Sequence, residues 1–247
     1  MTVERAAELL SAARKGVAFT GAGISAESGI PTFRGAGGLW TKYDPIKVSS
    51  IESFMQDPTA YWMVSKERGG ITLAARPNPG HIALATLEAS GNLVAVVTQN
   101  TDGLHQAAGS RRVIELHGSA RTVECLDCGI RESRAVVQAR LAVQMPPVCK
   151  SCGGTHLKPT VVLFGEPMPV AAMHEALALA QAADVMLVVG SSLVVRPAAD
   201  VPLSAVRSGA KLIIINTEPT PLDSHADVMI QGRAGEVLPE ILTLVNA

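Results

Sequence analysis

Four short apolar runs, rich in β-branched residues, recur along the chain. They occupy Gly16–Thr20, Leu93–Thr98, Asp184–Val189 and Lys211–Asn216. Near-continuous hydrophobicity over such short stretches is typical of strands buried on both faces of a parallel sheet.

Helical patterns alternate with these strands. They cover Pro79–Ala89, Val170–Ala182 and Ala198–Ser208, and two further helices are expected at the chain ends, around Leu10 and Leu238. Alternation of strand and helix predicts an α/β fold with a doubly wound, Rossmann-like parallel sheet.

Two segments interrupt this alternation. Residues 30–76 hold both Trp, both Tyr and two of the four Phe, and residues 121–159 hold all four Cys. We interpret the first as a cofactor loop with a helical insertion and the second as a separate zinc-ribbon module, which together form a small subdomain. Residues 1–29, 77–120 and 160–247 then make up the Rossmann-like domain.

Composition narrows the class of protein. Of the 247 residues, 47% are hydrophobic and 17% charged, with a formal net charge of −1, so a disordered chain or a broad nucleic-acid footprint is not expected. No apolar run reaches the roughly 18 residues that a membrane span needs, and the N-terminal residues lack the pattern of a secretory signal. We expect a cytoplasmic protein, without a membrane or nucleic-acid partner.

The cysteines form two CxxC pairs. Cys125 and Cys128 form the first pair and Cys149 and Cys152 the second, with 20 residues between Cys128 and Cys149. This spacing predicts tetrahedral zinc. Four thiolates leave no open coordination position, so one structural rather than catalytic Zn²⁺ is expected. The alternatives are redox CxxC pairs or free thiols.

Glycines and polar residues follow each of the four strands. Gly21, Ala22 and Gly23 follow the first, Gln99, Asn100, Thr101 and Asp102 the second, Gly190, Ser191 and Ser192 the third, and Asn216, Thr217 and Glu218 the fourth. Ligands of open parallel sheets bind at these strand ends, so one crevice for an extended dinucleotide is predicted. By itself the first cluster could serve only tight strand–helix packing, because it departs from G-x-G-x-x-G and no acid follows about 20 residues on.

Two further residues carry chemistry. His117 follows a short strand at Arg112–Glu115 and can reach the same crevice, where its unperturbed pKa suits a general base, although such a His is more often structural. Arg34 could contact a phosphate or hold a loop. Arg131, Arg134 and Arg140 are interpreted as a solvated face.

In combination, these segments resemble the sirtuin family over nearly the whole chain. GAGISAESGIPTFRGAGGLW is similar to its cofactor loop, TQNTDGLH to its nicotinamide pocket and ELHGS to its catalytic-histidine motif, while VVLFGEPMP, GSSLVVRPAA and INTEPTP follow in the family's order. The resemblance implies NAD-dependent removal of acyl groups, acetyl above all, from protein lysines, giving nicotinamide, O-acyl-ADP-ribose and free lysine.

The resemblance also implies roles for individual residues. His117 is the general base that activates a ribose hydroxyl, Asn100 and Asp102 hold the nicotinamide carboxamide, and Phe33 shields the reactive face from water. The remaining cofactor contacts would be Ile24, Glu27, Thr32, Trp40 and Ala234, beside Arg34 and the strand-end clusters. Val162, Phe164 and Val195 would pair with an acyl-lysine peptide as an added strand.

The cofactor loop resembles the subgroup that removes succinyl and malonyl groups. That subgroup has a Tyr-x-x-Arg pair for the acyl carboxylate, whereas this chain has Ser65 and Arg68. Because the Tyr is missing, we expect uncharged acyl groups to be removed better than succinyl.

Other functions stay open. An NAD glycohydrolase or mono-ADP-ribosyltransferase could use the same crevice, and a non-catalytic NAD or ADP-ribose sensor could bind a partner through the zinc module. We expect acylated-lysine proteins or peptides as partners and a monomeric enzyme.

Overall fold

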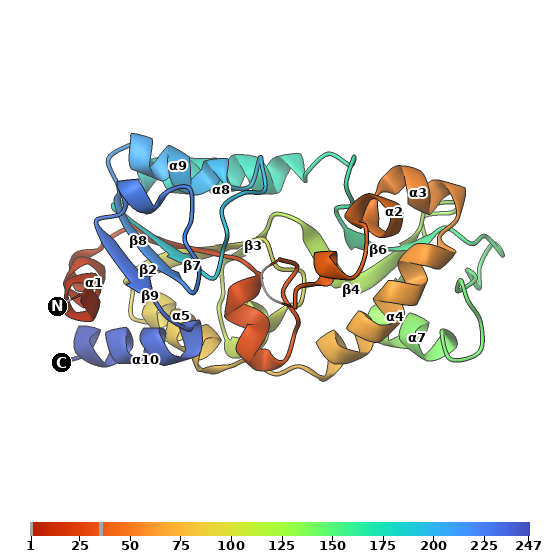
Figure 1. Ribbon diagram of the computed structural model, residues 1–247, viewed down its shortest axis with the longest axis horizontal. Coiled ribbons are helices and arrows are strands. Elements are labelled where there is room, and N and C mark those ends of the chain that lie inside the picture. The colour runs from red at the N-terminus through yellow and green to blue at the C-terminus, as the bar shows by residue number, and fades with distance from the viewer. Residues whose placement is uncertain (1, 35–36) are drawn as a thin grey trace.

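Six parallel strands form the main sheet of the computed structural model, which describes residues 2–34 and 37–247 (Figure 1). They run in the order β3-β2-β1-β7-β8-β9. The strands are β1 (Gly16–Thr20), β2 (Leu93–Thr98), β3 (Val113–Glu115), β7 (Val185–Val189), β8 (Lys211–Asn216) and β9 (Val228–Gln231). Strand order reverses between β1 and β7, so the connections that follow these two strands run in opposite directions along the sheet, the position at which open parallel sheets bind ligands.

Helices cover both faces of this sheet. On one face α1 (Thr2–Ala12), α5 (Pro79–Ala89) and α10 (Ala234–Val245) pack around Ala18, Val96 and Ile213. On the other, α8 (Val170–Ala182) and α9 (Asp200–Arg207) pack around Phe19, Met186 and Ile214 (Figure 1). Alternate residues of each strand therefore serve two separate apolar cores, which confirms the doubly wound α/β fold.

A smaller body lies at the other end of the molecule (Figure 1). Its sheet is antiparallel, with the order β5-β4-β6, and it packs against helices from the earlier insertion. Its elements are α2 (Pro45–Ser49), α3 (Ile51–Gln56), α4 (Thr59–Ala74), β4 (Gly118–Cys125), β5 (Arg131–Ser133), α7 (Arg134–Arg140) and β6 (Leu157–Val161). Phe54, Trp62, Val123 and Leu157 share one core, so two segments distant in sequence fold together.

Short helices complete the connections. They are the 3₁₀ helices η1 (Ala22–Ser28), η2 (Leu39–Thr41) and η3 (Asp223–His225), and α6 (Leu104–Ala108). None of the helices described in the structure is long and apolar enough to cross a membrane.

The expected strands and helices are confirmed, with small shifts at some ends. The helix expected from Ala198 begins at Asp200, and the strand expected from Asp184 begins at Val185. The Asp184 carboxylate accepts hydrogen bonds from the N–H groups of Arg14 and Lys15. Sequence reasoning missed β9, a short edge strand in which Val228 and Ile230 are buried.

Candidate active site

A cavity of about 370 Å³ opens at the carboxyl ends of β1 and β2 and extends to the smaller body. It brings together many of the residues that the sequence pointed to. The predicted residues that line it are Ala22, Phe33, Arg34, Trp40, Arg68, Gln99, Asn100, Thr101, Asp102, His117, Val162, Phe164 and Val195. One cavity therefore contains the candidate base, the polar cluster after β2 and the candidate acyl-lysine residues.

The glycines after β1 allow two strand ends to meet. A Cβ at Gly21 would lie 2.7 Å from the carbonyl oxygen of Gly190, and one at Gly23 would lie 2.7 Å from the Gly190 Cα. Gly190 itself has a φ of 62°, a conformation that glycine adopts without strain. The loops after β1 and β7 thus pack backbone to backbone at the point where the strand order reverses.

A polar network fixes the segment after β2. Asn100 donates through Nδ2 to the Gly21 carbonyl at 3.0 Å and to the Ser25 Oγ at 3.1 Å. Ser25 Oγ in turn donates to Asp102 Oδ2 at 2.8 Å. These bonds hold the side chains of Asn100 and Asp102 in place before any ligand binds.

Two further histidines, which sequence reasoning did not single out, lie next to this network. His81 approaches Ser25 Oγ at 3.4 Å through Nε2, and Asn78 N–H donates to its Nδ1 at 3.4 Å. His105 Nε2 lies 2.8 Å from Thr20 Oγ1. Burial lowers the pKa of His81 to about 4 and that of His105 to about 3, so both rings are neutral near pH 7.

The ring of His117 is oriented by the backbone of β2. Its Nδ1 lies 3.0 Å from the carbonyl oxygen of Gln99, and since a carbonyl can only accept, Nδ1 carries the proton. In the neutral ring Nε2 then keeps a free lone pair, as a general base requires. Burial lowers the pKa of His117, and the Gln99 carbonyl opposes part of that shift.

Gln99 offers a polar atom that the protein does not satisfy. Its Oε1 accepts from Ser191 Oγ at 3.1 Å, whereas its buried Nε2 has no hydrogen-bond partner among the described residues. An orphaned donor is costly unless a ligand or water satisfies it. With the glycine turn and the network of Asn100, this donor fits a polar nucleotide in the crevice.

Other predicted cofactor residues lie outside the cavity. The side chain of Ile24 is buried in the apolar core, and Thr32 Oγ1 donates to the Arg34 carbonyl. Glu27 accepts from Gly235 N–H at 2.7 Å, beside Ala234 at the start of α10. Ile24 is fully buried, and its carbonyl accepts from Asn78 Nδ2 at 2.7 Å, so it does not face the cavity.

The residues after β7 and β8 are held mainly by hydrogen bonds within the protein. Ser191 Oγ also accepts from Leu193 N–H, Asn216 Nδ2 donates to the Glu218 carbonyl at 2.7 Å, and the Thr217 carbonyl accepts from Gln231 Nε2. Ser192 is half-buried and Glu218 is exposed. The Glu218 carboxylate is therefore free to face solvent or a ligand.

The end of the cavity in the smaller body differs from the sequence interpretation. Arg134 is not solvated but only 4% exposed, and its guanidinium donates to Ser65 Oγ at 2.9 Å and to the Ser65 carbonyl at 2.6 Å. Arg140 pairs with Glu132, so of the three arginines only Arg131 is exposed. Arg134 and Tyr61 line the cavity and were missed, because only the packing of α7 on α4 brings them there.

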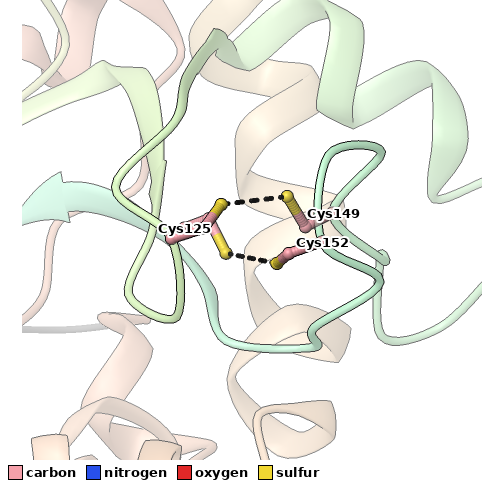
Figure 2. A group of neighbouring side chains, drawn as sticks. Cys125, Cys149 and Cys152 are labelled. Carbon is pink, nitrogen blue, oxygen red and sulfur yellow. Dashed lines mark hydrogen bonds between the residues drawn. The ribbon is translucent and has the colours of Figure 1, made fainter.

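The four cysteines meet at one point. Figure 2 shows Cys125, Cys149 and Cys152 pointing toward one another. All four sulfurs lie within 4.8 Å of one another, and two of the sulfur–sulfur distances are 3.6 Å (Cys125–Cys152) and 3.7 Å (Cys128–Cys149). Tetrahedral zinc with bonds of about 2.3 Å separates its sulfurs by roughly 3.8 Å, so the cluster fits a structural Zn²⁺.

Comparisons with known proteins agree with this geometry. The model of the Sir2 family matches residues 21–197. The NAD-dependent protein deacylase 2 of Archaeoglobus fulgidus is 52% identical over 99% of this chain and 96% of its own length. A solved Sir2 structure with a deacetylated p53 peptide and 3′-O-acetyl ADP-ribose has a TM-score of 0.94 at 40% identity and covers 98% of both chains.

A second solved structure, Sir2Af2 bound to a myristoylated histone peptide, has a TM-score of 0.86 at 43% identity and covers 99% of this chain and 96% of that one. The family model spans most of the chain, and both the relatives and the solved structures match it nearly end to end. This chain therefore belongs to the Sir2 family.

Proposed function

We propose that this protein is an NAD-dependent protein-lysine deacylase. The observation that carries the proposal is the position of His117. Its Nδ1 is anchored on the Gln99 carbonyl, in a cavity that also contains Asn100, Asp102 and the apolar segment around Val162. A base with a free Nε2 thus shares one space with the candidate sites for both substrates.

The chain's own residues divide the work. NAD supplies the electrophilic C1′ carbon of its nicotinamide ribose, which the acyl oxygen of the substrate lysine attacks. Asn100 and Asp102 bind the nicotinamide carboxamide, and the bonds that fix them to Gly21 and Ser25 mean that little reorganisation is needed. His117 Nε2 then takes a proton from a ribose hydroxyl.

Water is kept out by the aromatic residues of the loop after η1. Phe33 and Trp40 lie 5.3 Å apart, and Trp40 lies 6.2 Å from Phe164, measured between ring centroids. Val162, Phe164 and Val195 would bind the acyl-lysine segment beside this aromatic cluster. Gly190 and Ser191 would contact the cofactor beside Gln99, while Asn216 and Glu218 would face the adenosine end.

The metal would have a structural role. Cys125, Cys128, Cys149 and Cys152 would hold one Zn²⁺ that ties two loops of the smaller body together. We further propose that the enzyme acts as a cytoplasmic monomer without a nucleic-acid partner. One chain supplies every group assigned here to the reaction, and the net charge of −1 offers no broad cationic face.

Nicotinamide release, measured with and without an acetyl-lysine peptide, tests the proposal. Release should depend on the peptide, and mass spectrometry should find O-acetyl-ADP-ribose. His117→Ala should lower deacylation by about 10²–10⁴-fold while NAD and peptide still bind. His174→Ala, at an exposed position on α8, is the control and should leave the rate unchanged.

The alternatives give different results. Nicotinamide release without peptide would indicate a glycohydrolase, and NAD binding without turnover would indicate a sensor. Near-normal deacylation by His117→Ala would remove His117 from the base role.

A further inference from the structure

One arginine of the cavity has an aromatic ring as its partner instead of a carboxylate. The guanidinium carbon of Arg68, on α4, lies 4.2 Å from the centroid of the Phe33 ring. Among the described residues no carboxylate lies within ion-pair distance of Arg68, and burial lowers its pKa. A partly desolvated guanidinium over a ring face is attracted by the ring's quadrupole.

The turn of α4 that carries Arg68 is fixed by two side chains of α7. Arg134 donates to the Ser65 carbonyl at 2.6 Å, and Gln138 Nε2 donates to the Lys66 carbonyl at 2.8 Å. A Cβ at Gly69 would collide with the Arg134 guanidinium, so glycine at that position permits the approach. The backbone just before Arg68 is therefore hydrogen-bonded to α7, and Gly69 just after it packs against Arg134.

Phe33 lies outside the helices and strands, and its carbonyl accepts a hydrogen bond from Trp40 N–H of η2 at 3.0 Å, whereas its ring is held only by side-chain contacts. It lies between η1 and η2, it is 36% exposed, and Trp40 and Arg68 contact its ring. A clamped guanidinium on one side of the ring limits where the ring can move. The position of the loop between η1 and η2 thus depends on its contact with α4, although the two are separated in sequence.

We propose that Arg68 is a positioning residue that holds the Phe33 ring at the reactive end of the cavity, with Arg134 fixing the turn of α4 from which Arg68 acts. The effect on catalysis described next rests on the proposed function. If the ring moves away, water reaches C1′ of the nicotinamide ribose. The bond from C1′ to the nicotinamide nitrogen then breaks, a bond from C1′ to the water oxygen forms, nicotinamide leaves with the electron pair, and one proton is released.

The first test compares three single variants on the full-length, zinc-loaded protein. Arg68→Met keeps the length of the side chain without its charge, and Arg68→Lys keeps a cation. Lys66→Met, which removes an exposed cation from the same helix, is the matched control. Each is assayed for the ratio of nicotinamide released to lysine deacylated, and for NAD affinity by calorimetry.

Arg68→Met should weaken NAD binding or raise that ratio by roughly 2- to 30-fold, the range that one cation–π contact supports. Arg68→Lys should restore part of the loss, and Lys66→Met should match the wild type. The KM for an acetyl-lysine peptide should stay the same in all three. Wild-type values for Arg68→Met in both measurements would overturn the proposal.

A double-mutant cycle with Phe33→Leu shows whether Arg68 acts through the ring. Arg68→Met should have no further effect on NAD affinity once the ring is gone. Additive effects of the two substitutions would mean that Arg68 acts by another route and would contradict the proposal. NAD affinity can be measured without turnover, so a wild type that fails to deacylate would contradict the proposed function while the cycle still tests Arg68.

Discussion

Acidification should destabilise this protein through His81 and His105. Both rings are buried, with exposed fractions of 0% and 1%, and burial lowers their pKa values to about 4 and about 3. In the unfolded chain both titrate near 6.5. Below that pH the unfolded state binds protons that the folded state does not, so stability is complete above about pH 6.5 and is lost as the pH falls.

The magnitude follows from these pKa values. Each of these His residues lowers the protein's free energy of unfolding by roughly 1.4 kcal/mol per pH unit below its unfolded pKa. This amounts to about 2 kcal/mol per residue between pH 7 and pH 5. Two such residues give about 4 kcal/mol, a large part of the roughly 5–15 kcal/mol typical of folded proteins. The rings lie 5.0 Å apart, so in the folded state they titrate as a coupled pair.

Urea denaturation at pH 7, 6 and 5, followed by far-UV circular dichroism, measures this slope. His105→Asn should remove about half of the loss, even if it also lowers stability at pH 7. His174→Gln, on the surface of α8, should leave the slope unchanged. An equal fall in unfolding free energy for the wild type and His105→Asn would refute the reasoning.

Three further predictions concern the site. Because burial lowers the pKa of His117, the acid limb of kcat/KM for an acetyl-lysine peptide should lie below pH 6.5, and a limb near pH 7.5 would contradict the assignment. Cys125→Ser or Cys149→Ser should lower zinc content from one per chain to none and lower Tm, and an unchanged Tm would contradict a structural metal. Since Ser65 Oγ is bonded to Arg134 and Arg68 lies on Phe33, acetyl- and butyryl-lysine should exceed succinyl-lysine in kcat/KM. A succinyl advantage that is lost in Arg68→Ala would show that Arg68 binds the acyl carboxylate instead.

The parallel sheet could be predicted because its strands are buried on both faces and carry uninterrupted apolar runs. β9 escaped notice because an edge strand of four residues carries too short a pattern. The site residues also fall into those that the sequence could predict and those that it could not. His117 and the residues after β2 follow strand ends, so their meeting could be inferred from parallel topology.

Contacts between distant segments could not be predicted in this manner. Arg134 had the pattern of a solvated arginine, and only the packing of α7 against α4 buries its guanidinium beside Ser65. His81 and His105 approach each other from α5 and α6, whose relative placement no local pattern specifies. Tyr61 reaches the cavity for the same reason.

The chain leaves the larger body for the smaller one after η1, returns at α5, leaves again at β4 and returns before α8. The smaller body is consequently assembled from two loops, each tied at both ends to a sheet that can fold first. Its loop-closure entropy is already reduced when the main sheet forms, so the larger body acts as a template for it. Any continuous gene fragment that encodes both α4 and α7 also encodes α5 and β2 of the larger body. The smaller body therefore cannot be produced alone as one continuous piece of the chain.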